Sequence, residues 1–104
     1  MKTLTPGHCY WLADFDDPQG IGQIIQFFEE EPIAPGSTTL RTVNDGTTNE
    51  EVLEMLIDRI GMLNAKVPCR ENAIVLTHLE TAKLWLENRT ADRKKRNVEG
   101  TAQK

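Results

Sequence analysis

The second half of the sequence, from Thr47 onward, has apolar residues at helical spacing, and this pattern limits the fold more than any other feature. In its first segment the apolar residues recur three and four positions apart, at Val52, Leu53, Leu56, Ile57, Ile60 and Leu63. This spacing is typical of one face of an amphipathic helix. The preceding Thr48 and Glu51 have the spacing of a capping box, which predicts that the helix begins there.

A second helix is predicted from about Cys69 to at least Asn88, after a short connector at 64–68 with Pro68 near the helix start. This helix has two apolar stripes. One contains Val75, Leu76, Leu79, Ala82 and Leu86, and the other contains Ile74, His78, Thr81 and Trp85. The first stripe can pack against the preceding helix in a hairpin. The second stripe, with Trp85, needs another surface, either the rest of the chain or another subunit.

The first half predicts short strands. Residues 8–15 alternate in the period of a strand, 22–31 are rich in β-branched and aromatic residues, and 38–44 precede an Asp-Gly turn. We therefore expect an α+β fold in a single domain, 1–104. It has a β-rich part at 1–46 with about three antiparallel strands, a two-helix hairpin at 47–98 and a flexible tail at 99–104. A chain of 104 residues has a modest core, so assembly into a homo-oligomer is expected.

Composition excludes several function classes. The formal charge is −4, from 16 acidic and 12 basic residues, which argues against a protein that coats a nucleic-acid polymer. Cys9 and Cys69 have no CxxC spacing, and there is no signal peptide or long apolar run. These features predict a reduced, soluble, intracellular chain that does not enter a membrane.

Basic residues are concentrated in one segment, 89–96, which holds Arg89, Arg93, Lys94, Lys95 and Arg96. The three arginines share a face if the second helix continues past Asn88. A guanidinium group can bind phosphate through two hydrogen bonds and can stack on a base. The alternative is a solvated helix end, where cations are favoured by the helix dipole. As tail residues, the arginines are expected to contribute little to stability.

No catalytic or metal-binding constellation is recognisable. His8 and His78 share no ligand spacing with the cysteines, so a zinc site is not expected. The acidic run 29–31 fits a solvated strand end better than an acid–base pair. Phosphate-binding glycine loops and hydrolase motifs are missing, so we predict no enzyme activity, no metal and no cofactor.

Three ordered segments resemble a known family. They are CREN at 69–72, LTHLETAKLWL at 76–86, and the arginine-rich run from Arg89 to Thr101. Together with the helix entry GTTNEE at 46–51, they resemble the hairpin domain of phage nucleotide sponges. These are the Thoeris anti-defence (Tad) family and its relative, the anti-CBASS sponge. The resemblance covers about residues 46–101 and is loose over the strands.

The resemblance implies that the chain binds a cyclic nucleotide messenger of bacterial immunity without degrading it, in the cytoplasm of the infected host. It implies glyco-cyclic ADP-ribose in pockets between subunits of a dimer or hexamer, and cyclic di- or trinucleotides at separate sites. Matched by motif, Asn72, Arg89 and Arg93 would contact the nucleotide, with Arg96 nearby. Met62 stands where the family usually has an aromatic residue.

Several alternatives stay open at this point. Asn72 could instead cap the start of the second helix. Arg41 is a possible residue of a second cyclic-nucleotide site. The protein could be a sponge for cyclic oligonucleotides alone, an enzyme that cleaves the nucleotide, or an assembly or adaptor protein that binds no nucleotide.

Overall fold

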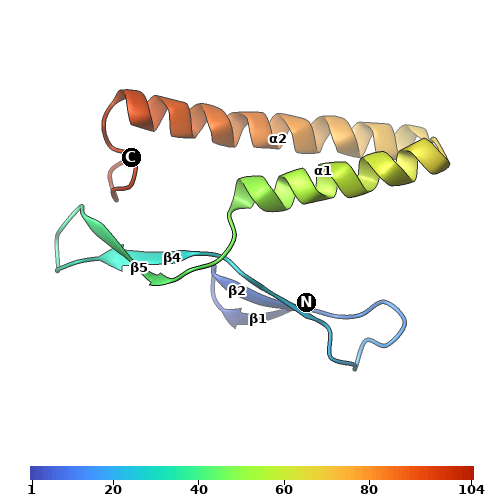
Figure 1. The fold of residues 1–104 in the computed structure, drawn as a ribbon, viewed down its shortest axis with the longest axis horizontal. Coiled ribbons are helices and arrows are strands. Elements are labelled where there is room, and N and C mark those ends of the chain that lie inside the picture. Colours follow the sequence, from blue (N-terminus) through green and yellow to red (C-terminus); the bar gives the residue numbers. More distant parts are fainter. The chain divides into compact units, whose positions relative to one another are not determined.

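The computed structural model describes residues 1–104, which divide into two compact units, Met1–Thr48 and Asn49–Lys104. The first unit contains five strands and the second contains two helices (Figure 1). The α+β class, with small antiparallel sheets before two helices, is therefore confirmed.

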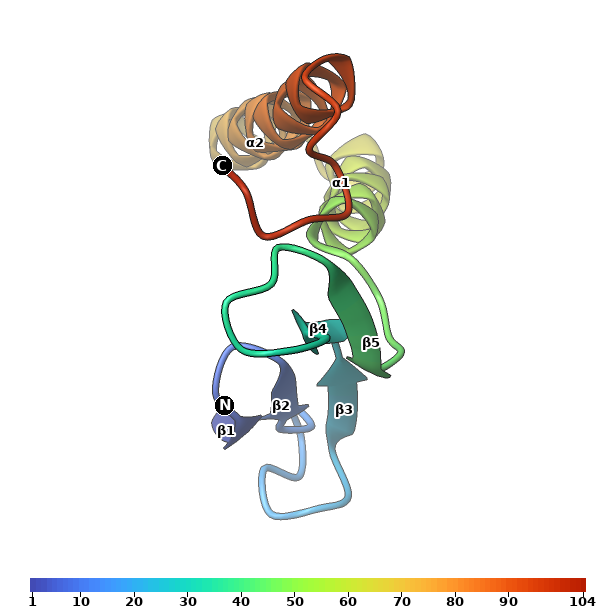
Figure 2. The same ribbon diagram turned by 90° about the vertical axis from the view of Figure 1, so that its left-hand side faces the viewer.

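The first unit has more strands than the sequence predicts. β1 (Lys2–Thr5), β2 (Cys9–Leu12) and β3 (Gln23–Gln26) form one antiparallel sheet in the order β1-β2-β3 (Figure 2). β4 (Glu29–Pro32) and β5 (Leu40–Asn44) form a second, two-stranded sheet. The estimate of about three strands is too low, because it missed β1 and joined β3 to β4.

The interruption between β3 and β4 has a clear cause in the hydrogen bonds. The Phe27 N–H donates to the His8 carbonyl at 2.7 Å, whereas the Phe28 N–H donates to the Thr47 carbonyl at 3.1 Å. The chain thus changes its pairing partner between two consecutive residues. The Thr47 N–H completes this link by donating to the Gln26 carbonyl at 2.8 Å.

The second unit is the predicted helical hairpin. α1 (Asn49–Lys66) and α2 (Arg70–Lys95) pack side by side and run in opposite directions (Figure 1). Cys69 is the N-cap of α2, and its Sγ accepts a hydrogen bond from the Asn72 N–H at 3.4 Å. The Cys69 N–H in turn donates to Asn64 Oδ1 at 3.0 Å, which fixes the short connector.

One face of α2 is covered and the opposite face is not. The covered residues, which we call the inner face of α2, recur at three and four: Asn72, Leu76, Leu79, Lys83, Leu86, Thr90 and Arg93. Trp85 and Leu84 lie outside this face and are 68% and 55% exposed. The second apolar stripe of the sequence is therefore largely solvent-facing in the single chain.

α2 ends in a Schellman motif, the hydrogen-bonded reversal that often closes helices. The Asn97 N–H donates to the Lys94 carbonyl at 3.1 Å, and the Val98 N–H donates to the Arg93 carbonyl at 3.0 Å. Asn97 takes the left-handed conformation that this motif requires, with φ of 59°. Gly100 also has a positive φ, 82°, which a glycine adopts without steric cost in a turn.

Candidate functional site

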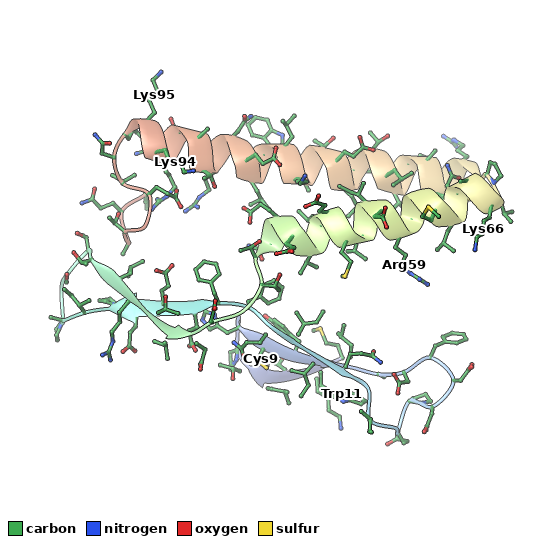
Figure 3. All side chains as sticks on the ribbon, in the orientation of Figure 1. Cys9, Trp11, Arg59, Lys66, Lys94 and Lys95 are labelled. Carbon is green, nitrogen blue, oxygen red and sulfur yellow. The ribbon has the colours of Figure 1, made fainter.

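The C-terminal end of α2 gathers five cations within two helical turns. Arg89, Arg93, Lys94 and Lys95 lie in the helix, and Arg96 is its C-cap. In Figure 3, Lys95 points away from the hairpin into solvent. The helix continues past Asn88, as the shared arginine face requires, yet the arginines have quite different surroundings.

Arg93 is the one buried charged residue of the chain, with 4% of its surface exposed. Its Nε donates to Glu99 Oε2 at 3.2 Å, and one terminal nitrogen donates to the carbonyls of Val98 and Thr101 at 2.9 and 2.8 Å. The other terminal nitrogen donates to the Gln103 carbonyl. The burial and the four hydrogen bonds of Arg93 argue against the expectation that this side chain contributes little to stability.

Arg89 is exposed and has no ion pair or hydrogen bond through its side chain within the chain. Arg96 is about half exposed and its Nε contacts Asp92 Oδ2 at 3.0 Å. Exposed ion pairs of this kind are weak, so Arg96 can exchange its partner at little cost. Among the three arginines of this cluster, Arg89 is therefore the one whose side chain is both exposed and without a partner.

Asn72 and Met62 lie near the opposite end of the hairpin, close to the connector. The Asn72 side chain is half-buried and makes no hydrogen bond within the chain, so the capping alternative is wrong for this residue; Cys69 is the cap. Met62 is 59% exposed on α1. At 1.5 Å per residue, Asn72 and Arg89 are about 25 Å apart along α2.

This separation means that one chain does not bring the predicted nucleotide-contacting residues together. A mononucleotide-sized ligand is much shorter than the distance between Asn72 and Arg89. Within a single hairpin, such a ligand can contact either the Asn72 end or the arginine end.

A shallow groove of about 450 Å³ lies between these two ends. Ile57 of α1 lines one wall, and the rest is formed by α2 residues Glu80, Thr81, Lys83, Leu84 and Glu87. Lys83 Nζ is 3.4 Å from Glu87 Oε1, so its charge is compensated. None of the residues predicted to contact nucleotide lines this groove.

Arg41 lies on β5 in the first unit and is mostly exposed. Both Nε and one terminal nitrogen of its guanidinium donate to Glu31 Oε1, with the Nε contact at 2.8 Å. An anion at this position would compete with a cross-strand carboxylate. The role of Arg41 in a second nucleotide site stays a prediction.

No group of three or more His, Cys, Asp or Glu side chains is close enough to hold a metal ion. Neither helix is long and apolar enough to cross a membrane. The His8 and Glu29 side chains are 3.7 Å apart in the first unit.

The contact between Glu99 and Arg93 was not predicted from the sequence. The Glu99 carboxylate contacts Arg93 across a turn, and the only local signal was the Asn97 and Gly100 pair, which predicts a chain reversal without naming its partner. The flexibility expected for residues 99–104 stays a prediction.

The fold and these surfaces define a class: a two-helix hairpin domain with a cluster of cations at one end and strands before it. The sequence profile of the Acb2/Tad1 hairpin domain matches residues 25–91, and the chain belongs to this family. The match includes Arg41, Met62, Asn72 and Arg89, but it ends before Arg93 and Arg96.

A curated relative gives the same family relationship. The chain is similar to Thoeris anti-defense 1 of Bacillus phage SBSphiJ7, with 46% identity over 61 residues. This alignment covers 58% of the chain and 43% of the relative, so the chain spans less than half the length of that protein.

Proposed function

We propose that the protein is a phage anti-defence protein that binds the Thoeris messenger glyco-cyclic ADP-ribose and sequesters it without cleaving it. The observation that carries this proposal is Arg89, an unpaired and exposed guanidinium within the family match. It stands near Lys94 and Arg96, at the end of a hairpin whose family includes a Thoeris anti-defence protein. The messenger carries a pyrophosphate, and guanidinium groups bind phosphate oxygens in a two-point geometry.

The nucleotide pocket is formed between subunits. Asn72 with Met62 and Arg89 with Arg96 lie at opposite ends of one hairpin, so a single chain offers two half-sites. Two hairpins packed in opposite directions would bring the Asn72 end of one to the arginine end of the other. Asn72 then contributes an unpaired amide that can read a base or ribose edge, and the arginines bind the pyrophosphate.

The exposed apolar residues of the hairpin support such an assembly. Trp85, Leu84 and Met55 are 68%, 55% and 52% exposed, and Cys9 is the only apolar residue of the chain that is buried. Large apolar side chains exposed to this extent on a small domain are typical of surfaces that bind another protein. We propose a homo-oligomer, a dimer or a hexamer, in the cytoplasm of the infected bacterium, with no nucleic-acid polymer or membrane as partner.

Binding without catalysis is the mechanism that these residues favour. Arginine stays protonated at neutral pH and cannot act as a general base. Asp92, the nearest carboxylate to Arg96, is already engaged by that residue. The residues at this end can therefore hold an anion, but they offer no nucleophile activated by a base.

Titration of the protein with glyco-cyclic ADP-ribose tests the proposal. Binding should saturate at a fixed ratio of messenger to subunits, and heating should release the messenger unchanged in mass. Destruction of a large excess of messenger by a small amount of protein would instead show an enzyme.

The Arg89→Ala variant should weaken binding by about 1.5–3 kcal/mol, the usual value for a charge-assisted hydrogen bond. Lys95→Ala is the matched control, since it removes the same charge from the same helix end at a side chain that points away (Figure 3). Equal affinities of Arg89→Ala and the parent protein would contradict this site.

A cyclic di- or trinucleotide is a second candidate ligand, at a site that includes Arg41 on β5. A specific loss of cyclic dinucleotide binding in Arg41→Ala, with glyco-cyclic ADP-ribose binding unchanged, would establish two separate sites. Loss of neither ligand would leave Arg41 as a partner of Glu31 only.

A further inference from the structure

Residues 98–103 supply all the hydrogen-bond acceptors of the Arg93 side chain, at the place where a bound anion would contact it. Arg93 donates to one carboxylate, on Glu99, and to three main-chain carbonyls, on Val98, Thr101 and Gln103. Of these acceptors only Glu99 carries a charge. The guanidinium of Arg93 therefore has almost no donor left for a phosphate group while the segment is in place.

In the ion pair between Glu99 and Arg93, the arginine is much more deeply buried than the carboxylate. The side chain of Arg93 is 5% exposed, whereas that of Glu99 is 38% exposed. The Glu99 carboxylate is already partly hydrated, so its release from Arg93 leaves no unpaired buried charge on the tail. The free-energy cost of this release comes from the buried guanidinium of Arg93, which then needs another anion.

The segment also makes hydrogen bonds within itself. Beyond the Schellman motif, the Thr101 N–H donates to the Val98 carbonyl at 3.1 Å and the Gln103 N–H donates to Thr101 Oγ1 at 3.2 Å. Both bonds are local, and neither ties the segment to α1. Gly100, with its positive φ, lies inside this turn. The segment can leave α2 without disturbing the helix pair.

We propose that Glu99 is an internal competitor for the ligand's phosphate: its carboxylate neutralises Arg93 in the free protein, and a pyrophosphate-bearing nucleotide displaces it together with residues 98–103. This inference rests on the proposed function. The exchange replaces one anion by another on a buried cation, so the charge balance at Arg93 is preserved in both states. It makes Arg93 available to the ligand only after the tail has moved, whereas Arg89 is available from the start.

Replacement of Glu99 by glutamine tests the competition. The Glu99→Gln variant keeps the shape of the side chain and removes its charge, so the tail competes less well. Affinity for glyco-cyclic ADP-ribose should rise roughly 1.5- to fivefold, the range expected for loss of a partly exposed ion pair. Glu54→Gln is the matched control, because Glu54 is exposed on α1 and takes part in no ion pair. It changes the net charge equally and should leave the affinity unchanged.

Hydrogen exchange provides an independent readout in the parent protein. The amides of Val98 and Thr101 are hydrogen-bonded in the free state, so they should exchange faster when the messenger is saturating. Slower exchange of these amides on binding, or equal affinities for Glu99→Gln and the parent, would overturn the proposal. If both the parent protein and the Glu99→Gln variant fail to bind the messenger, the proposed function itself is wrong. This outcome can be distinguished from the two results that overturn only the competition by Glu99.

Discussion

Replacing Arg93 by alanine should lower the free energy of unfolding of the hairpin unit by about 1–2 kcal/mol. The side chain makes four hydrogen bonds from a position that is 4% exposed, and all four acceptors belong to the segment 98–103. Alanine removes these bonds and the packing of the arginine stem, so the segment loses its main anchor.

Two opposing contributions set the size of this loss in unfolding free energy: the lost hydrogen bonds and the backbone entropy that the released segment regains. Charge-assisted hydrogen bonds contribute about 1.5–3 kcal/mol each when the partner stays buried and unpaired. Here the three carbonyls and the Glu99 carboxylate can turn to water once the segment detaches. The released residues also regain about 1 kcal/mol or more of backbone entropy each. The loss is therefore limited to the free energy of docking the segment, well below the sum of four buried bonds.

Urea denaturation followed by helical circular dichroism measures this loss. Arg89→Ala is the matched control, because Arg89 is exposed on the same helix end and has no partner; it should change stability by less than about 0.5 kcal/mol. Equal unfolding free energies for the two variants would refute the reasoning, since they would show that the tail contacts of Arg93 contribute nothing measurable.

Further predictions concern the helix start, a tight turn and ionic strength. Cys69→Ser should stabilise the hairpin by about 0.5–1 kcal/mol in thermal unfolding, because a hydroxyl oxygen is a better acceptor than sulfur for the Asn72 N–H; Cys69→Ala should not stabilise it. Gly22→Ala should speed hydrogen exchange of the β2 amides strongly, because its Cβ would lie 2.5 Å from Trp11 Nε1 at a φ of 65°. Gly7→Ala, also at positive φ but with open space around it, should have a smaller effect. Messenger binding should weaken as salt is raised, and salt-independent affinity would argue against an arginine–phosphate contact.

The helices could be predicted from the sequence because their apolar period is long and regular. Both helices appear where the spacing places them, and α2 begins directly after Cys69, as expected. The strands were harder to predict because each is only four or five residues long. β1 has a single apolar residue, Leu4, so no alternation marks it. The break after Gln26 depends on pairing with Thr47, a contact between distant residues that local patterns do not contain.

The candidate site was predictable in its residues but not in their surroundings. Spacing indicates that Arg89, Arg93 and Arg96 share one side of a helix. It does not indicate whether another segment covers that side. The covering segment follows a chain reversal at Asn97, so its return onto α2 depends on tertiary contacts with Arg93 itself. The 25 Å separation of Asn72 and Arg89 was, in contrast, implied by the sequence once both residues are placed on one helix.

The lengths of the two helices explain why a charged residue is buried at this point. α1 has 18 residues and α2 has 26, so the last turns of α2 extend beyond the partner helix. Where α1 covers the inner face of α2, that face is mostly leucine: Leu76, Leu79 and Leu86. At Arg93 the covering element is an irregular segment that presents main-chain carbonyls to the helix. An apolar side chain would leave the Thr101 and Gln103 carbonyls without this donor, whereas a guanidinium supplies several donors at once. The same helix end therefore buries Arg93 against the tail and leaves Arg89 exposed and without a partner.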